Sequence, residues 1–250
     1  MPLAGAGKRF ADKGFSLPKP LIPIDGLPMV IQAARALPDA DQWFFLCQQE
    51  HIREYSIDAL LHQEYPGSTV IPVNGLTAGQ LATCLLAEPF VGSESQLTIG
   101  VCDIRTYWNR EKFRSEFKES HDADALIWTF RNNPAVNINP SAYGWVQADE
   151  KGFVEKVSVK VSLSNTPIRD HAVSGIFSFK KAGYFFQSAQ HMIQTDRRVH
   201  NEFYNDECMN VLIEAGKNVK VFEGDMFVSF GTPEDVWTYE YWKDYFLNHE

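Results

Sequence analysis

Several features that would indicate other classes of protein are scarce in this chain of 250 residues. Its four cysteines stand singly, with no C-x-x-C pair and no histidine-rich neighbourhood. This scatter argues against a metal cluster or a disulfide framework and indicates buried, reduced thiols. No apolar run approaches the roughly 20 residues of a membrane span, and the N-terminus lacks the basic-then-apolar pattern of a secretory signal. We therefore expect a cytoplasmic protein with no membrane partner.

Basic residues are also in deficit. The chain has 23 Lys and Arg against 32 Asp and Glu, which gives a formal net charge of -9. A charge of this sign disfavours a nucleic-acid backbone as the main partner. Any phosphate group bound here must therefore be met by local positive charge. The sequence has no internal repeat and no low-complexity linker, so we expect a single domain over residues 1–250.

Short apolar runs alternate with segments of helical periodicity through the first half of the chain. Strands are predicted at 43–47, 68–73, 96–102 and 125–130. Helices are predicted at 28–37, 52–62, 78–87 and 110–120. The alternation is typical of βαβ crossovers, so the fold class is α/β, with a mostly parallel sheet flanked by helices.

The pattern of apolar and polar residues changes near 141–165. Alternating residues there flank the turn D-E-K-G, which predicts a small antiparallel β-hairpin insertion. The α/β pattern then resumes, with strands predicted at 172–179 and from Val219, and with helices at 182–193, at 202–215 and from Pro233.

The chain opens MPLAGAGKRF, a glycine-rich turn that matches neither the P-loop nor the dinucleotide fingerprint. Gly5 and Gly7 nevertheless permit positive φ, so that exposed N–H groups can face an anion. Lys8 and Arg9 add positive charge, and the turn would suit a triphosphate. The alternative is an ordinary tight turn with two solvated basic residues.

A rigid lysine follows in the segment Pro18-Lys19-Pro20. Both neighbours of Lys19 have a fixed φ, and Pro20 also favours an extended backbone at Lys19. A lysine with a preset backbone loses less entropy when its ammonium group binds a phosphate. The alternative is a rigid turn that carries a solvated lysine.

Asp103 follows the apolar run T-I-G-V-C, at the carboxyl end of a predicted strand. Ligands gather at this end of the strands in open α/β sheets. A carboxylate there suits Mg²⁺, which prefers oxygen ligands and bridges phosphates. A turn or capping aspartate is the alternative.

These segments, in this order, resemble a known family. The series consists of G-A-G-K-R-F, P-K-P-L-I-P, D-G-L-P-M, G-L-T-A-G-Q at 75–80, V-C-D at 101–103, the Y-G-W-V to V-S-V-K hairpin, S-G-I-F at 174–177 and F-G-T-P-E-D at 230–235. It resembles nucleotidyltransferases of the sugar-1-phosphate pyrophosphorylase family, closest to the branch found in capsule and surface-polysaccharide gene clusters. The resemblance implies a Rossmann-like, GT-A-like fold and covers nearly the whole chain.

The resemblance also implies a reaction. A phosphate oxygen of an acceptor attacks the α-phosphorus of an NTP and pyrophosphate leaves, so that catalysis is mostly positioning and charge neutralisation. The implied catalytic residues are Arg9, Lys19 and Asp103, with Mg²⁺ on Asp103. The implied nucleotide-binding residues are Leu3, Ala4, Gly5, Gly7, Lys8, Gly79 and Gln80, and the implied acceptor-binding residues are Gly144 and Lys160.

The partners implied are an NTP and a phosphorylated small-molecule acceptor, with no nucleic acid. A pyrimidine nucleotide (CTP, UTP or dTTP) is favoured by the resemblance alone, and a homo-oligomer stays open.

Two positions depart from the family pattern. Ser229 stands where many members carry a second magnesium aspartate, and Glu234 and Asp235 are explained as the start of a capped helix. Magnesium would then be held by Asp103, phosphates and water, or Ser229 would contribute indirectly. Val159 stands where sugar-using relatives usually carry glutamate, and this loss should alter the choice of acceptor.

Two alternatives to a sugar-phosphate enzyme follow from these departures. One is a cytidylyltransferase acting on a non-sugar phosphate or phosphonate, such as a phosphorylated amino acid. The other is a catalytically silent, nucleotide-sugar-binding regulatory subunit.

The strand before the opening turn is unusually short, since only Met1-Pro2-Leu3 precede it. We expect residues encoded upstream to restore an apolar run.

Overall fold

The structure is a computed structural model that describes residues 1–117 and 122–249. It divides into two compact units. The N-terminal unit comprises residues 1–76 and 101–106 and the described residues from 228 onward. The central unit comprises residues 77–100 and the described residues of 107–227.

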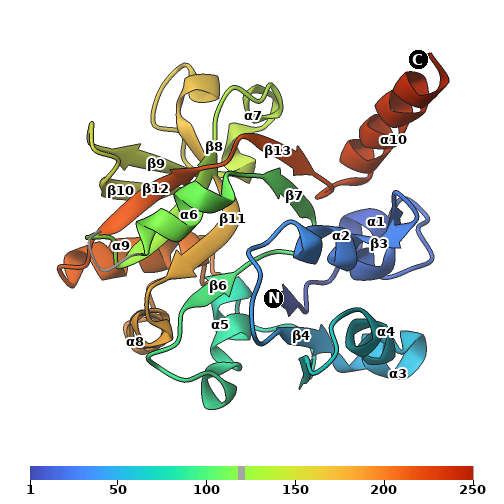
Figure 1. The fold of residues 1–250 in the computed structure, drawn as a ribbon, viewed down its shortest axis with the longest axis horizontal. Helices are drawn as coiled ribbons and strands as arrows, with labels where there is room; N and C mark the ends of the chain where they lie inside the picture. The colour runs from blue at the N-terminus through green and yellow to red at the C-terminus, as the bar shows by residue number, and fades with distance from the viewer. Residues whose placement is uncertain (118–121, 250) are drawn as a thin grey trace. The chain divides into compact units, whose positions relative to one another are not determined.

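A parallel sheet of three strands lies at the centre of the N-terminal unit, in the order β1-β4-β5 (Figure 1). The strands are β1 (Pro2–Leu3), β4 (Phe44–Gln48) and β5 (Thr69–Val73). Leu3 pairs with Cys47, and Cys47 pairs with Pro72. The helices α2 (Met29–Arg35), α3 (Gln49–Tyr55) and α4 (Ile57–Glu64) connect the strands. The parallel βαβ arrangement expected here is confirmed.

The single helix predicted at 52–62 is wrong. Two helices, α3 and α4, meet at Ser56, whose φ of 51° is left-handed. The N–H of Ser56 still donates to the carbonyl of Ile52, which ends α3. Ile57 and Leu61 of α4 are buried, whereas no residue of α3 is, and neither a glycine nor a proline stands at the break to mark it in the sequence.

A second buried cluster in the N-terminal unit supports the opening turn and the lysine segment. The elements here are α1 (Lys8–Ala11), the 3₁₀ turn η1 (Lys19–Leu21), the hairpin β2 (Pro23–Ile24) and β3 (Leu27–Pro28), and α10 (Pro233–Asn248). The buried side chains are Phe10, Ile22, Ile24, Met29, Phe230 and Val236. Phe10 follows the glycine turn directly, so this cluster anchors the turn to the fold.

The central unit contains a six-stranded sheet in the order β10-β9-β11-β8-β12, with β6 paired to β11 (Figure 1). The strands are β6 (Leu97–Ile99), β8 (Ala125–Phe130), β9 (Gly144–Ala148), β10 (Val154–Val159), β11 (His171–Phe179) and β12 (Val219–Glu223). Strands β8 and β12 are parallel, and the other pairs are antiparallel. The predicted hairpin is confirmed as β9 and β10, with Val159 opposite Gly144.

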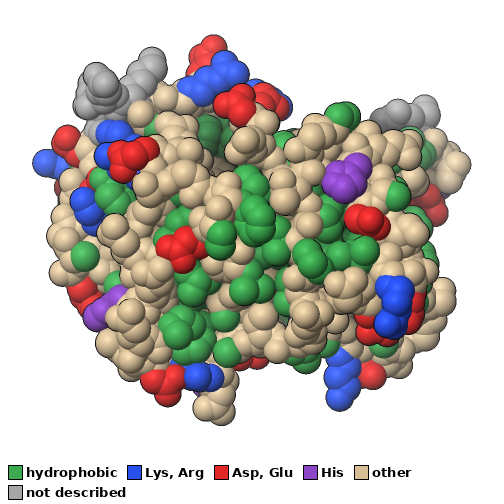
Figure 2. Space-filling view, turned by 90° about the horizontal axis from the view of Figure 1, so that it is seen from below, with side chains coloured by type: hydrophobic (Ala, Val, Ile, Leu, Met, Phe, Trp, Pro, Cys, Tyr) green, Lys and Arg blue, Asp and Glu red, His purple; other side chains and the backbone are tan. Residues whose placement is uncertain are grey.

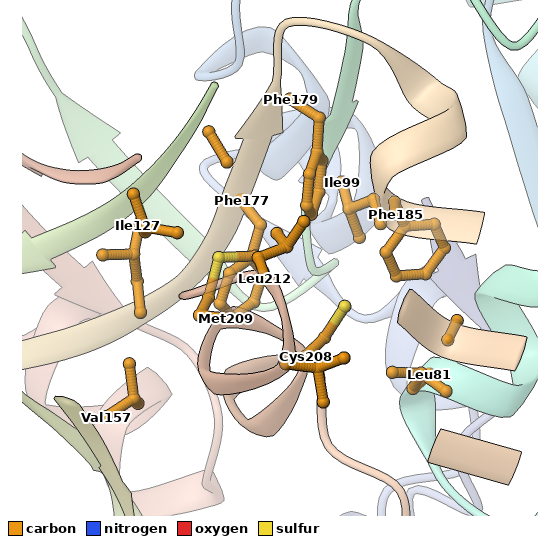
Figure 3. Close-up of a cluster of buried hydrophobic side chains, with 14 of the residues drawn as sticks. Leu81, Ile99, Ile127, Val157, Phe177, Phe179, Phe185, Cys208, Met209 and Leu212 are labelled. Atoms are coloured by element: carbon orange, nitrogen blue, oxygen red, sulfur yellow. The ribbon is translucent and has the colours of Figure 1, made fainter. Parts of the chain in front are cut away.

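Helices pack on this sheet through one large core. They are α5 (Gln80–Leu85), α8 (Ala182–Gln194) and α9 (Asn205–Glu214). Figure 3 shows strand residues such as Ile127, Phe177 and Val157 gathered around Met209 and Leu212 of α9. Sheet and helices together confirm the α/β fold class.

Other elements complete the described chain. Helix α6 (Arg110–Glu116) begins where the sequence predicts, and the last predicted residues, 118–120, lie outside the described residues. The remaining elements are α7 (Ala135–Ile138), the 3₁₀ turns η2 (Glu88–Phe90), η3 (Pro140–Ala142) and η4 (Pro167–Arg169), and the paired strands β7 (Ile104–Tyr107) and β13 (Met226–Ser229).

The helices in the described part of the chain do not combine the length and the apolar character of a membrane span. On the face that Figure 2 draws, acidic and basic side chains lie in small, interspersed groups.

Candidate active site

The glycine turn places backbone and basic side chains around an open space in the N-terminal unit. Gly7 adopts a left-handed φ of 59°, and a Cβ at this position would lie 3.3 Å from the Cβ of Lys19. A Cβ at Gly5 would meet nothing within 4 Å. Lys8 and Arg9 follow as exposed residues of α1. Glycine at position 7 therefore allows Lys19 to approach the turn closely, while position 5 remains open to a ligand.

Leu3 and Ala4 are placed differently. Their side chains are buried, and the carbonyl of Ala4 accepts a hydrogen bond of 2.8 Å from Nε2 of Gln48. Contact of either residue with a nucleotide would therefore involve the backbone. Gln48 ends β4 beside this turn, and the sequence contains no signal that singles it out.

Lys19 lies between two prolines and begins the 3₁₀ turn η1, so the extended backbone expected at this residue is wrong: the turn is closed by a hydrogen bond from the Leu21 N–H to the Pro18 carbonyl. Pro18 has a φ of −60° and a ψ of 145°, and Pro20 is buried within the turn. The Nζ of Lys19 forms a short ion pair with Oδ2 of Asp103, and the two side chains are only 17% and 20% exposed. Burial alone would lower the pKa of the Lys19 ammonium, but Asp103 raises it, and the net pKa lies above the usual value. Lys19 is thus held in its charged form.

Asp103 lies in the turn between β6 and β7 and is fixed by its backbone as well. Its carbonyl accepts a hydrogen bond of 2.7 Å from the N–H of Phe230. This bond brings the carboxylate close to the segment that precedes α10, in which Ser229 and Gly231 flank Phe230.

Three oxygens converge around Gly231. The position that a Cβ would take there lies 3.2 Å from Oγ of Ser229, 3.4 Å from Oδ2 of Asp103 and 3.7 Å from Oδ2 of Asp235. Ser229 Oγ donates to Asp235 Oδ2 at 2.9 Å and accepts from the Gly231 N–H at 3.1 Å. The absence of a side chain at Gly231 leaves this oxygen-lined space open.

Asp235 also has the capping role predicted for it. Thr232 accepts a hydrogen bond from the Asp235 N–H, and the Asp235 carboxylate accepts one from the Thr232 N–H, which forms a capping box. The prediction from the sequence missed the bond between Asp235 and Ser229. This bond connects the missing-aspartate position to a carboxylate six residues later.

The pairing of Lys19 with Asp103 can be measured as a coupling energy. We expect Lys19→Met and Asp103→Asn each to lower the free energy of unfolding by about 1 to 3 kcal/mol, because each leaves a half-buried charge without its partner. In urea denaturation at pH 7 the double variant should lose less than the sum of the two, by about 1 kcal/mol or more. Additive losses would show that the pair does not stabilise the fold.

In the central unit, the segment with Gly79 and Gln80 is bound closely to Phe203. Gly79 has a φ of 125°, and a Cβ there would lie 2.6 Å from both the backbone N and O of Phe203. The N–H of Leu81 donates to the Phe203 carbonyl at 3.1 Å, and the Phe203 N–H donates to the Ala78 carbonyl at 2.9 Å. Gln80 begins α5 and is partly exposed, so that its amide can reach a ligand.

Two glycines with positive φ allow a matched test of this close approach. We expect Gly79→Ala to lower the free energy of unfolding by at least about 3 kcal/mol, because its Cβ overlaps the backbone of Phe203. Gly75 also has a positive φ, of 72°, but open space around its Cβ position. Gly75→Ala should therefore cost only about 1 kcal/mol in the same thermal unfolding measurement. Equal losses for the two variants would contradict the close approach.

The acceptor-side residues of the central unit come together around an aspartate. A Cβ at Gly144 would overlap Oδ2 of Asp206, which packs directly on this glycine from α9. The Nζ of Lys160 lies 5.4 Å from the ring centre of Tyr204, the residue before α9, and also bonds closely to the Ala142 carbonyl. The sequence analysis singled out Gly144 and Lys160, which the structure places near each other, but not the neighbouring Tyr204 and Asp206.

The environment of Asp206 is costly for a charge. Burial raises the pKa of its carboxyl to about 6, although Lys160 acts in the opposite direction. Burial, together with the charge of Glu202 and a hydrogen bond to its carboxylate, raises the pKa of the Tyr204 phenol to about 12, so the phenol stays protonated. The central unit thus presents a cation, a phenol and a poorly solvated carboxylate around Gly144.

This raised pKa gives stability a definite dependence on pH. A pKa that is higher in the folded protein than in the unfolded chain means that folding favours protonated Asp206. The stability that this provides is fully present below the unfolded pKa of about 4 and is lost as pH rises through about 6. We expect Asp206→Asn to raise the free energy of unfolding by about 1 to 3 kcal/mol at pH 8 and to leave it nearly unchanged at pH 4. Urea denaturation at both pH values measures this. The exposed Asp225→Asn is the control, and an equal effect at the two pH values would contradict the assignment.

A comparison with protein families places the chain. The profile of the family described as Nucleotidyl transferase matches residues 3–245, and the chain therefore belongs to this family. It is a nucleotidyltransferase enzyme, as the resemblance implies. No curated protein matches the sequence.

Solved structures of nucleotidyltransferases share the fold. The nucleoside-diphosphate-sugar pyrophosphorylase from Vibrio cholerae RC9 is 14% identical with a TM-score of 0.76, over 96% of this chain and 99% of that one. The inositol-1-phosphate CTP transferase from T. maritima is 16% identical with a TM-score of 0.74, over 96% and 91%. HddC from Yersinia pseudotuberculosis, complexed with GMP-PN, is 18% identical with a TM-score of 0.63, over 95% of both chains. At these identities the likeness shows the fold alone.

Proposed function

We propose that this enzyme transfers an NMP from an NTP to a phosphorylated small-molecule acceptor and releases pyrophosphate. The observation that carries the proposal is the Lys19–Asp103 ion pair beside the open glycine turn, in a chain of the nucleotidyl transferase family. A half-buried cation and carboxylate next to an open backbone turn are suited to a triphosphate and its counter-ion.

The chemistry requires little covalent work from the protein. An oxygen of the acceptor phosphate forms a bond to the α-phosphorus of the NTP, and the bond from that phosphorus to the bridging oxygen of pyrophosphate breaks. The nucleophile is already anionic, so positioning and charge neutralisation carry the catalysis. In this proposal Lys8 and Arg9 neutralise the leaving phosphates, and Gly5 and Gly7 let the backbone approach them.

The ion pair keeps the two charges proposed for catalysis at the site before a ligand binds. Lys19 and Asp103 satisfy one another while no ligand is bound, which avoids an unpaired charge in a half-buried place. On binding of the triphosphate, we infer that the Lys19 ammonium turns from Asp103 to the α-phosphate. The Asp103 carboxylate is then free to face a cation.

Magnesium fits the oxygens around Gly231. Asp103 would hold it, with Ser229 and Asp235 lining the same space, since all three oxygens lie within 4 Å of one point. Among the described residues, no three His, Cys, Asp or Glu side chains group as a protein-only metal site, so phosphates and water would complete the set. When bound, Mg²⁺ would supply neutralisation of the developing phosphate charge.

We propose that the residues that contact the base of the NTP, and those that contact the acceptor, lie in the central unit. Gly79 and Gln80 would contact the base, with a pyrimidine favoured, and Gly144 and Lys160 would contact the acceptor. We propose that both units form one nucleotidyltransferase domain that acts in the cytoplasm on precursors of capsule or surface polysaccharide. The acceptor is a sugar 1-phosphate or, as Val159 favours, a non-sugar phosphate or phosphonate such as a phosphorylated amino acid.

Pyrophosphate release tests the proposal. The protein is incubated with CTP, UTP, dTTP, ATP or GTP, with Mg²⁺ and a panel of phosphorylated acceptors. We expect release with at least one pair, and Lys19→Ala or Asp103→Ala should lower kcat/KM by about 100-fold or more, because each removes charge at the reacting phosphate.

The matched control is Lys13→Ala, which removes an exposed lysine of the same segment that pairs with Glu234. It should leave kcat/KM within about twofold. Binding of an NTP without release across the whole panel would overturn the enzyme proposal and favour a catalytically silent, nucleotide-sugar-binding regulatory subunit.

A further inference from the structure

The resemblance implies a carboxylate at position 159 of the hairpin, where this chain has Val159, and helix α9 places the carboxylate of Asp206 against Gly144, the strand partner of Val159. Val159 lies directly opposite Gly144 in the β9–β10 ladder, so the two Cβ directions share one face of the sheet. Gly144 has no side chain to fill its half of this pair. The carboxylate of Asp206 occupies that space, packed against the glycine.

Helix α9 is held in register with β10, so the placement of Asp206 is a fixed feature of the fold. The side chain of Asn210 accepts from the Val157 N–H and donates to the Val157 carbonyl, both at 2.8 Å. Asp206 precedes Asn210 by four helical residues, or about 6 Å, and Val159 follows Val157 by two strand residues, or about 6.6 Å. These matching steps bring Asp206 beside the Val159–Gly144 pair.

The buried face of α9 makes this register rigid. Cys208, Met209 and Leu212 lie in the core of the central unit, and Figure 3 shows them gathered with Val157 and Phe177. Asp206 precedes Cys208, the first core residue of α9, by two positions and lies in the first turn of the helix. Its carboxylate is therefore positioned by packing that does not depend on its charge.

The groups that face Asp206 compensate for its burial only in part, although a backbone hydrogen bond to the carboxylate also stabilises its charge. Lys160 attracts it from the end of β10, and Glu207, its neighbour on α9, repels it. The carboxylate of Glu207 is itself engaged by Arg197 and Asn210. From β11 the neighbour is the apolar Val173, whose Cγ2 lies 3.1 Å from the Gly144 Cβ position. A carboxylate in such surroundings gains from a ligand that donates hydrogen bonds to it.

The backbone of Lys160 adds an independent sign of function. Lys160 has a left-handed φ of 65°, which is costly for a residue with a Cβ. Its N–H donates to the Tyr143 carbonyl at 3.1 Å, which closes the open end of the hairpin next to Gly144. Strained positions of this kind gather where a side chain must be aimed at a ligand.

We propose that Asp206 is the specificity-determining residue for the acceptor, and that it selects phosphate monoesters carrying a hydrogen-bond donor, a hydroxyl or an ammonium group. This inference rests on the proposed function. Lys160 attracts the acceptor phosphate, and Asp206 accepts from the donor group. An acceptor that lacks the donor leaves the carboxylate without a partner and is rejected.

Two variants distinguish an acceptor whose hydrogen-bond donor is a hydroxyl from one whose donor is an ammonium group. Asp206→Asn keeps an oxygen that accepts from a hydroxyl but removes the charge that attracts an ammonium group, whereas Asp206→Ala removes both. The acceptor KM is measured by pyrophosphate release, with glucose 1-phosphate and galactose 1-phosphate as hydroxyl acceptors, O-phosphoserine and phosphoethanolamine as ammonium acceptors, and methyl phosphate as an acceptor without a donor.

For the productive acceptor, we expect Asp206→Ala to raise KM about tenfold or more, with the KM for the NTP unchanged. Asp206→Asn should raise it tenfold for an ammonium acceptor and only about two- to threefold for a hydroxyl acceptor. Use of methyl phosphate should not decline in either variant. The exposed Asp225→Asn should change none of these values.

A pH profile separates recognition from a structural role. In the wild type, the acceptor KM should rise as pH falls through about 6, because Asp206 becomes protonated. The acceptor phosphate titrates in the same pH range with the wild type and with every variant. The difference between the pH profiles of the acceptor KM in the wild type and in Asp206→Asn therefore isolates the effect of the Asp206 carboxylate.

Each outcome is decisive. Wild-type turnover with an unaltered acceptor KM and pH profile in Asp206→Asn and Asp206→Ala would overturn this inference while the proposed function stands. Failure of the wild type to release pyrophosphate with any pair would overturn the proposed function and the inference with it.

Discussion

The need to pair charges in half-buried places governs the N-terminal unit. Lys19 and Asp103 are 84 residues apart in the chain and satisfy each other at a site that leaves each about one-fifth exposed. Lys19 lies close against Gly7, where a Cβ would come within 3.3 Å of the lysine Cβ, and the Phe230 N–H donates to the Asp103 carbonyl. The glycine turn, the two prolines and the segment before α10 therefore serve one contact. The charges that suit a triphosphate are stable without it because each has the other.

The residues that local chemistry determines could be predicted from the sequence. Gly7 takes the positive φ expected of a tight turn, Thr232 and Pro233 begin a capped helix, and the D-E-K-G turn closes a hairpin. Each of these depends on residues within a few positions of one another. The helix break at Ser56 was not predicted because neither a glycine nor a proline marks it in the sequence.

The contacts that long-range packing determines could not be predicted. No local pattern indicates that Lys19 lies against Asp103, since the β6–β7 turn brings them together only in the folded chain. Asp235 is a clear example, because its capping role fully explains its presence in the sequence. Its second contact, with Ser229, depends on the strand that ends there. Local reasoning assigned the correct role to Asp235 and missed the one that bears on the site.

Asp206 shows how a carboxylate can reach a hairpin from a helix that packs on it. A carboxylate at position 159 would extend from the strand, whereas Asp206 reaches the same face of the hairpin from α9, and it fits only because position 144 is glycine. A side chain at 144 would displace Asp206. The position on α9 also affects the electrostatics of the carboxylate. Asp206 is poorly solvated there, and burial raises the pKa of its carboxyl. A group with such a cost in stability persists where a ligand repays it, and on this proposal the acceptor does so each time it binds.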